Sequence, residues 1–405
     1  MLELLFLGTG ASVPSRHKAT SCIAVRGGSD MILMDCGEGS QRQLMISPFS
    51  FMRIKAILIT HLHGDHVFGL PGLLQTMSLS GRKEHLTVYG PTGIKGCVDA
   101  FMTVTEGETV YPLEVCEVSG GEEFAVGDLT VSVYRTEHNI ASVGYTVREK
   151  DRPGKLDREK ALSLGIGDGP DMARLKNGVT VGDVTPQMVL GPSKKGESLS
   201  YTGDTVPCQS VIDGSRDVTV LIHECTYMAS ETNLAKKHKH STAIQAAEDA
   251  LSAGASHLIL THVSNRYDEL SVVVDEARTI FENTVAANDM DLFEIRNGGM
   301  SLRPRAERSS HQLAEFLPRP AFSLVRIWHR AHHLYRWVPH PSIQGRAPQH
   351  IFAPLLEFKN DIPPAIGEGD IFGRVIEGRS LLNAFYYSQN HEVVVRLIYD
   401  AHEVI

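Results

Sequence analysis

The stretch ITHLHGDHVFGLPG, residues 59–72, decides the fold. Within six positions of an otherwise apolar segment it carries four potential metal ligands: His61, His63, Asp65 and His66. The preceding residues IKAILIT (54–60) have the composition of a buried strand. In extended backbone, residues two apart point to the same side, so the first three ligands can converge while His66 points in a neighbouring direction. We expect the strand to lead through a Gly-containing loop into a helix that begins near Val67.

Imidazole nitrogens and carboxylate oxygens are the ligands that zinc accepts, and burying this cluster without a metal would leave costly unsatisfied groups. Four ligands in two directions suggest two ions, which need further ligands. Three candidates each follow an apolar strand: His138, Asp204 and His262. Taken singly, each has a structural alternative, a hydrogen-bonded histidine or a Gly-Asp turn. Their shared context supports one site, because strand ends can meet along one edge of a sheet.

The surrounding pattern predicts sheets between helices. Strands are expected over 2–8, 21–25, 31–35, 54–60, 86–90, 129–135, 198–204, 218–224 and 257–262, and helices over 66–81 and 241–255. Strands come first and then alternate with helices, which favours two sheets sandwiched between helical layers.

Composition narrows the classes further. The net charge of −9 argues against bulk attraction to nucleic acid but leaves room for a local basic surface. Six scattered cysteines without a CxxC pair suit free thiols in a reducing compartment, so we expect a cytoplasmic protein. The start, MLELLFLGTG, predicts a strand and turn rather than a signal peptide, and no apolar run reaches the roughly twenty residues of a membrane span.

A change of composition near residue 300 predicts a division of the chain into a domain over 1–300 and an extension over 301–405. The extension holds both tryptophans and only one lysine, and NGGMSLRPRAERSS (297–310) has the composition of a linker. Three interpretations of the extension stay open. IFGRVIEG and HEVVVRLIYDAHEVI can be strands of a small domain, residues 303–337 can form a basic RNA-contacting segment, or the extension can be an erroneous gene fusion.

The HxHxDH motif with the later His, Asp and His resembles the metallo-β-lactamase superfamily, an αββα sandwich that holds one or two zinc ions. Ordered motifs over about the first 300 residues sharpen this to a resemblance to ribonuclease Z, the tRNA 3′-processing endonuclease: FLGTGASVPS, DCGEGSQRQL, GDHVFGLPGLL, SYTGDT, HECTY, HKHSTAIQAA and THVSNRY. DCGEGSQRQL and the HST segment distinguish this family from hydrolases of glutathione thioesters or β-lactams. The resemblance implies that sandwich with an inserted arm, plus an extension of unknown fold.

The resemblance also implies two zinc ions per subunit. One ion would be held by His61, His63 and His138, the other by Asp65, His66 and His262, and Asp204 would bridge them. Asp65 would also be the proton acceptor. Such a pair activates water and neutralises charge at a phosphodiester.

Protonation of the leaving 3′-oxygen is implied to come from His240, paired with Glu224 of HECTY. We expect Ser241 to cap the helix that follows. Arg266 resembles a phosphate-facing arginine, because its guanidinium matches phosphate oxygens. A surface ion pair is the alternative for Arg266.

The segment between His138 and Asp204 is too long for a tight connection. It resembles the family's protruding arm, here about 148–195, which grips tRNA through a Gly-Pro turn at Gly169 and Pro170. Its basic residues could contact phosphates: Lys150, Arg152, Lys155, Arg158, Lys160, Arg174 and Lys176. Acidic residues alternate with them, so a solvated helical hairpin is an equal alternative.

Together these features predict a metal-dependent endoribonuclease that removes the 3′ trailer from precursor tRNA, leaving a 3′-hydroxyl on the tRNA and a 5′-phosphate on the trailer. The alternatives are another two-zinc phosphodiesterase or exoribonuclease of this fold, and a catalytically silent RNA-binding relative. The resemblance further implies a homodimer.

Overall fold

The computed structural model describes residues 1–303, 356–357, 371–377, 380–389 and 392–399. The chain divides into two compact units, Met1–Glu307 and Arg308–Ile405. Within the described residues, no helix is long and apolar enough to cross a membrane.

The first unit contains two sheets. The first sheet has the order β15-β14-β1-β2-β3-β4-β5-β6. Its strands are β1 (Leu2–Gly8), β2 (Cys22–Gly27), β3 (Asp30–Met34), β4 (Ile54–Leu58), β5 (Leu86–Gly90), β6 (Leu113–Glu117), β14 (Leu292–Arg296) and β15 (Gly299–Arg303). The run from β3 to β6 is parallel, and the remaining pairs are antiparallel.

The second sheet has the order β13-β12-β11-β10-β9-β8-β7. Its strands are β7 (Glu123–Val126), β8 (Leu129–Arg135), β9 (Val143–Glu149), β10 (Ser198–Tyr201), β11 (Val220–Glu224), β12 (His257–Thr261) and β13 (Thr284–Ala286). Strands β10 to β13 run parallel, so their carboxyl ends lie at one edge of the sheet.

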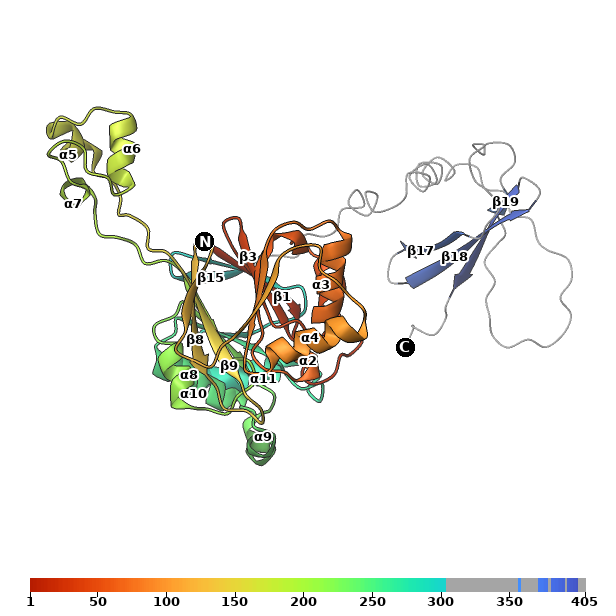
Figure 1. Ribbon diagram of the computed structural model, residues 1–405. Coiled ribbons are helices and arrows are strands. Elements are labelled where there is room, and N and C mark those ends of the chain that lie inside the picture. The colour runs from red at the N-terminus through yellow and green to blue at the C-terminus, as the bar shows by residue number, and fades with distance from the viewer. Residues whose placement is uncertain (304–355, 358–370, 378–379, 390–391, 400–405) are drawn as a thin grey trace, which may run out of the picture. The chain divides into compact units, whose positions relative to one another are not determined.

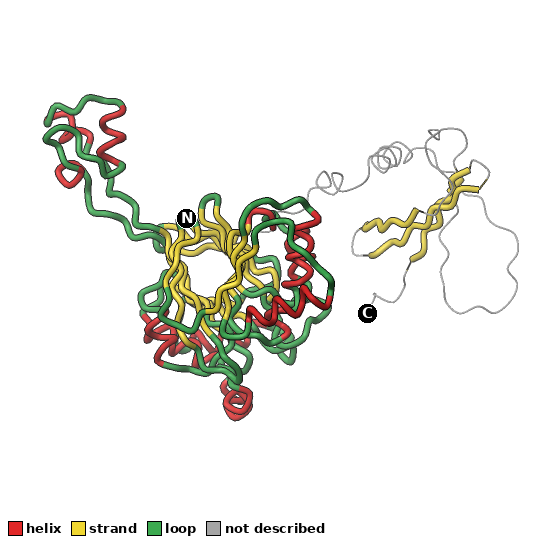
Figure 2. Tube along the Cα trace, viewed as in Figure 1, coloured by secondary structure: helices red, strands yellow, loops and turns green. Residues whose placement is uncertain are grey.

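Helices cover both outer faces of the paired sheets (Figures 1 and 2). The first sheet is covered by α1 (Ser40–Ile46), α3 (Leu70–Leu79) and α4 (Ile94–Val104), whose apolar side chains pack with those of β1 and β3. The second is covered by α10 (Ala243–Ala253) and α11 (Leu270–Arg278). Further helices are α2 (Gly64–Val67), α8 (Gln209–Gly214) and α9 (Thr232–His238). The result is the four-layer αββα arrangement that the sequence predicts.

The central core lies between the sheets. It is built from alternate residues of facing strands, such as Leu4 of β1, Ile32 of β3, Val131 of β8 and Ile222 of β11. The period-2 pattern thus places one face of each sheet toward the other. On α10, Ala243, Ala246, Ala247 and Ala250 lie on one face, and these small side chains let the helix pack closely on β11 and β12.

An arm projects from the second sheet between β9 and β10 (Figure 1). Two extended segments lead to three short helices, α5 (Arg158–Ser163), α6 (Pro170–Lys176) and α7 (Pro186–Val189). The segments are joined by bridges between Arg152 and Lys194 and between Leu156 and Leu190. The tip has its own small core: Ala161, Ile166, Met172, Leu175, Val184 and Val189.

In the second unit the described residues form a four-stranded sheet of order β16-β19-β18-β17. The strands are β16 (Leu356–Glu357), β17 (Ile371–Glu377), β18 (Ser380–Gln389) and β19 (Glu392–Tyr399). The strands expected in IFGRVIEG and HEVVVRLIYDAHEVI are therefore present as β17 and β19. The segment proposed to contact RNA, residues 303–337, lies outside the described residues except for Arg303.

Candidate metal centre

The HxHxDH segment follows β4 as expected, but one expectation about it was wrong. The backbone is extended at His63 and becomes helical at Gly64, the first residue of α2. Asp65 therefore leaves the alternating pattern and does not join His61 and His63. The helix begins three residues before Val67, then breaks at Phe68 and Gly69 before α3.

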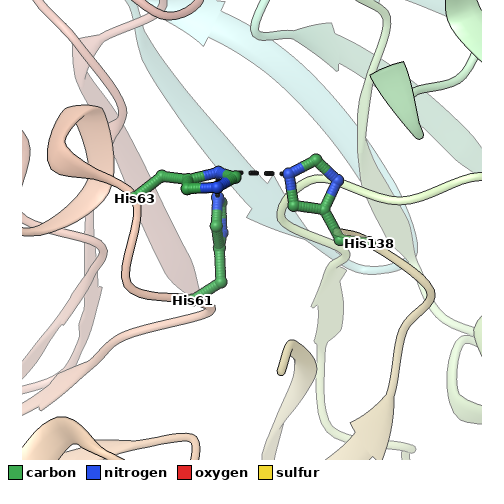
Figure 3. A group of neighbouring side chains, drawn as sticks. All are labelled: His61, His63 and His138. Carbon is green, nitrogen blue, oxygen red and sulfur yellow. Dashed lines mark hydrogen bonds between the residues drawn. The ribbon is translucent and has the colours of Figure 1, made fainter. Parts of the chain in front are cut away.

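His61, His63 and His138 form the first ligand group (Figure 3). Nδ1 of His63 lies 3.1 Å from Nε2 of His61 and 3.2 Å from Nε2 of His138. Nitrogens that coordinate one tetrahedral zinc at about 2.0–2.1 Å are about 3.3 Å apart. The three rings thus already converge at the spacing that a shared ion requires.

Asp65, His66, Asp204 and His262 form the second group. Oδ2 of Asp65 lies 3.3 Å from Nε2 of His262 and 3.6 Å from Nε2 of His66. Oδ2 of Asp204 lies 3.5 Å from His66, 3.4 Å from His262 and 3.7 Å from His61, so this carboxylate faces both groups. Nε2 of His66 and Oδ1 of Asp204 are buried and have no hydrogen-bond partner. Such orphaned atoms suit metal coordination.

The outer nitrogen of four of these imidazoles is held by an oxygen. Nδ1 of His61 lies 3.1 Å from Thr60 Oγ1, and Nδ1 of His66 lies 2.7 Å from Asp35 Oδ2. Nδ1 of His138 lies 2.8 Å from the Lys239 carbonyl oxygen, and Nδ1 of His262 lies 2.9 Å from Thr226 Oγ1. The Lys239 carbonyl can only accept, so Nδ1 of His138 carries the proton and its Nε2 is free to coordinate. Outer hydrogen bonds of this kind fix ring orientation at metal sites.

Asp35 was not predicted from the sequence. It follows β3 directly and is fully buried, and its carboxylate accepts from His66 Nδ1, Thr60 N and Tyr201 Oη. The signal was available, because an aspartate directly after a buried strand is the same context that singled out Asp204.

His240 and Glu224 are paired beside the second group. Nδ1 of His240 lies 2.9 Å from Oε1 of Glu224 and 3.8 Å from Oδ2 of Asp204. Burial alone would lower the pKa of His240, but the Glu224 carboxylate raises it to about 9. The pairing with Glu224 therefore favours the charged form of the imidazole.

The expected cap at Ser241 was wrong. Thr242 is the N-cap of α10, and its side chain accepts from Gln245 N in a capping box. The groups of Ser241 are used elsewhere, since its N–H donates to Glu224 Oε1 and its hydroxyl donates to the Thr205 carbonyl. Ser241 thus positions the carboxylate that pairs with His240.

Arg266 lies near these residues but not in the ligand groups. Its guanidinium donates to Glu231 and lies 5.0 Å above the ring of Tyr227, whose own ring is 6.0 Å from that of His240. The ion-pair alternative accounts for this geometry, and a phosphate contact by Arg266 stays a prediction.

The four predicted substrate-binding residues of the arm lie apart from the ligand groups. Arg158 forms an exposed ion pair with Asp168. Gly169 is the N-cap of α6 with φ 143°, and Pro170 is the first residue of that helix. Lys155 is exposed and lies between Arg152 and Leu156, the two bridged positions of the stalk. The three helices and the ion pairs of the arm agree with a solvated helical hairpin. The contact of the arm with tRNA stays a prediction.

Comparisons with known proteins agree with the fold. Residues 2–151 match the family model described as Anti-Pycsar protein Apyc1. Human tRNase Z, short form, superposes with a TM-score of 0.52 at 28% identity, over 73% of this chain and 99% of that one. A metallo-β-lactamase fold protein from Bacillus subtilis superposes with a TM-score of 0.53 at 20% identity, over 72% and 98%. The predicted metallo-β-lactamase sandwich is confirmed.

Sequence relatives are more specific. Ribonuclease Z of Methanosarcina mazei is 39% identical over 300 residues, which is 73% of this chain and 98% of the relative. Ribonuclease Z of Bacillus licheniformis is 41% identical over 305 residues, 73% and 99% of the two chains. The matched length corresponds to the first unit, which contains the two ligand groups. The chain therefore belongs to the ribonuclease Z family.

Proposed function

We propose that this chain cleaves precursor tRNA at the 3′ trailer and that two zinc ions per subunit occupy the ligand groups described above. The observation that carries the proposal is the set of two converging groups with Asp204 between them, next to the paired side chains of His240 and Glu224. His61, His63 and His138 would hold one ion, and Asp65, His66 and His262 the other. When bound, two ions would activate a water and neutralise charge on the phosphate.

The protein's own groups do the proton transfers. Asp65 takes the proton of the attacking water, and the Ser12 N–H, 2.8 Å from its Oδ2, holds that carboxylate in place. His240 gives its proton to the leaving 3′-oxygen, which leaves a 3′-hydroxyl on the tRNA and a 5′-phosphate on the trailer. Glu224 keeps the imidazole charged and oriented until that step.

Substrate binding is assigned to the arm. Lys155, Arg158 and the turn at Gly169 and Pro170 contact the tRNA away from the cut, and Arg266 contacts a phosphate near it. The 1–300 domain carries the activity, the 301–405 extension has no assigned role, and the protein works in the cytoplasm as a homodimer.

The test uses purified protein and a tRNA labelled at its 5′ end that bears a 3′ trailer. One endonucleolytic product ending in a 3′-hydroxyl supports the proposal. A ladder of shortened products would assign an exoribonuclease, and binding without cleavage would assign a silent RNA-binding relative. Zinc content, measured on the same preparation, should be two ions per subunit.

A further inference from the structure

The cleft that opens onto the ligand groups has a volume of about 530 Å³, within the range of small-molecule sites. Four of its lining residues form one group, since the ring of His240 contacts that of His138 and Asn139 donates to the His238 carbonyl. A second group contains Ser12, whose N–H donates to Asp65, and Phe68, whose ring lies against Gly64. The lining also includes Val13, Pro14, Thr20 and Glu38. None of the lining residues, all of them within the described range 1–303, is a lysine or an arginine.

Phe68 is the main apolar residue of that lining. It closes the one-turn helix α2, its N–H donates to the Gly64 carbonyl, and 62% of its surface is exposed. The ring lies directly against Gly64, since a Cβ added at Gly64 would be 2.3 Å from Cε2 of Phe68 and 2.7 Å from Cδ2 and Cζ. Glycine thus lets the ring fold back beside the ligand loop, while most of the surface of Phe68, a cleft-lining residue, stays exposed.

From this arrangement we propose that Phe68 stacks on the base of the first trailer nucleotide, an assignment that rests on the proposed trailer cleavage. An exposed aromatic ring with the Glu38 carboxylate in the same lining, and no lysine or arginine there, suits the flat face and amino edge of a base better than a phosphate. Val13 also lines the cleft and is 60% exposed, so it adds to the apolar surface that Phe68 offers.

The position of His240 decides which nucleotide is bound. The 3′-oxygen that His240 protonates belongs to the last nucleotide of the tRNA, so that nucleotide lies on the His240 side of the phosphorus. In this proposal the trailer leaves the phosphorus through its own 5′-oxygen, away from His240 and toward the lining group that contains Phe68. The base that reaches Phe68 is therefore the one that follows the cut.

The test combines Phe68 variants with two substrates, one with a normal first trailer nucleotide and one with an abasic residue there. Phe68→Leu keeps an apolar side chain but removes the flat ring. It should lower kcat/KM on the normal substrate by about 10- to 100-fold with unchanged zinc content. Phe68→Trp should retain activity. Leu79→Ala, a matched control at a surface residue 89% exposed and outside the cleft lining, should have no effect.

The abasic substrate separates stacking from a structural role. It should slow the wild type by a similar factor, and Phe68→Leu should add little further loss, because both changes remove one interaction. An equal loss in Phe68→Leu on both substrates, or no loss on either, would overturn the stacking assignment. Failure of the wild type to cleave the normal trailer would instead overturn the proposed function.

Discussion

The carboxylate of Asp35 lies 2.7 Å from Nδ1 of His66, and both residues are fully buried. The same carboxylate accepts from Thr60, whose hydroxyl contacts Nδ1 of His61. Asp35 thus connects one histidine of each ligand group without belonging to either group. A residue placed in this way should control how well the site holds its ions rather than the chemistry itself.

Asp35→Asn should lower the affinity for zinc by about 10- to 100-fold. An amide NH₂ cannot accept the hydrogen bonds that one carboxylate oxygen of Asp35 accepts from His66 Nδ1 and Tyr201 Oη, so the tautomer of His66 is no longer fixed. Competition with a chromophoric chelator measures this loss. Asp30→Asn is the matched control, since Asp30 is also buried but pairs with Lys55 at the far end of β3. Equal zinc affinity in Asp35→Asn and the wild type would contradict the role.

Shortening the arm should weaken tRNA binding and its salt dependence while sparing hydrolysis of a small phosphodiester. A two-residue turn can replace 157–189, because Leu156 and Leu190 already pair across the stalk. Each lost phosphate contact should reduce the slope of log K against log salt by about 0.9.

Single substitutions on the arm refine that prediction. Lys155→Gln should reduce the slope more than Arg158→Gln, because Arg158 is already paired with Asp168. Identical slopes for the shortened and complete proteins would exclude the gripping role.

Removal of the chain after Glu307 should leave trailer cleavage within about threefold of the full-length value, because a compact unit folds on its own core. The cut must not fall earlier. Arg303, at the end of β15, pairs with Glu3 and Glu294 and so fastens β15 to the first sheet. A zinc-loaded but inactive truncated chain would mean that the extension contributes to the site or to RNA binding.

Much of the fold could be predicted because its strands are apolar and β-branched. Every strand expected over the first 300 residues is present, with ends shifted by a few residues. Two of the strands that were not expected, β6 with Glu114 and β7 with Glu123, are half exposed and carry charges, so their hydrophobic pattern is weak. β9 is largely buried and was not expected, although only its last two residues fall within the segment assigned to the arm.

The ligand positions were predicted from strand ends, but their grouping was not derivable from spacing. Alternation places Asp65 with His63 only while the backbone stays extended, and the helix at Gly64 ends that alternation. Ser241 was expected to cap α10 because serine is a good cap. The N–H of Ser241 donates to the Glu224 carboxylate instead, and Thr242 is the N-cap. The error at Ser241 arises where a long-range contact overrides local preference.

A buried pair away from the metal centre predicts a pH-dependent stability. Burial alone would lower the pKa of His223, but Asp249, 3.3 Å from its Nε2, raises it. Because the pKa of His223 is raised in the folded protein, the pair stabilises the fold fully below the unfolded-state pKa of about 6.5. This stabilisation is lost as the pH rises through the folded-state pKa.

Asp249→Asn should therefore lower the free energy of unfolding by about 1–3 kcal/mol at about pH 6 and by clearly less above the raised pKa. Urea unfolding followed at the two pH values measures the difference. Asp213→Asn, which removes an exposed pair with Arg216, should change little at either pH. A pH-independent loss in Asp249→Asn would contradict a charged His223.

The last prediction separates His240 as a proton donor from His240 as a further metal ligand. Its Nδ1 is engaged by Glu224, and its distance of 3.8 Å from Asp204 is longer than the contacts that Asp204 makes with His66 and His262. His240→Ala should retain full zinc content and tRNA binding but lose cleavage by about 10²–10⁴-fold, with partial recovery on a substrate whose leaving group needs no proton.

Glu224→Gln should act in the same direction more weakly, because the imidazole stays and only the charge that favours its protonated form is removed. The double variant should be little worse than His240→Ala, since the two residues act as one unit. Loss of half the zinc in His240→Ala would identify a ligand, and unimpaired cleavage would exclude both roles.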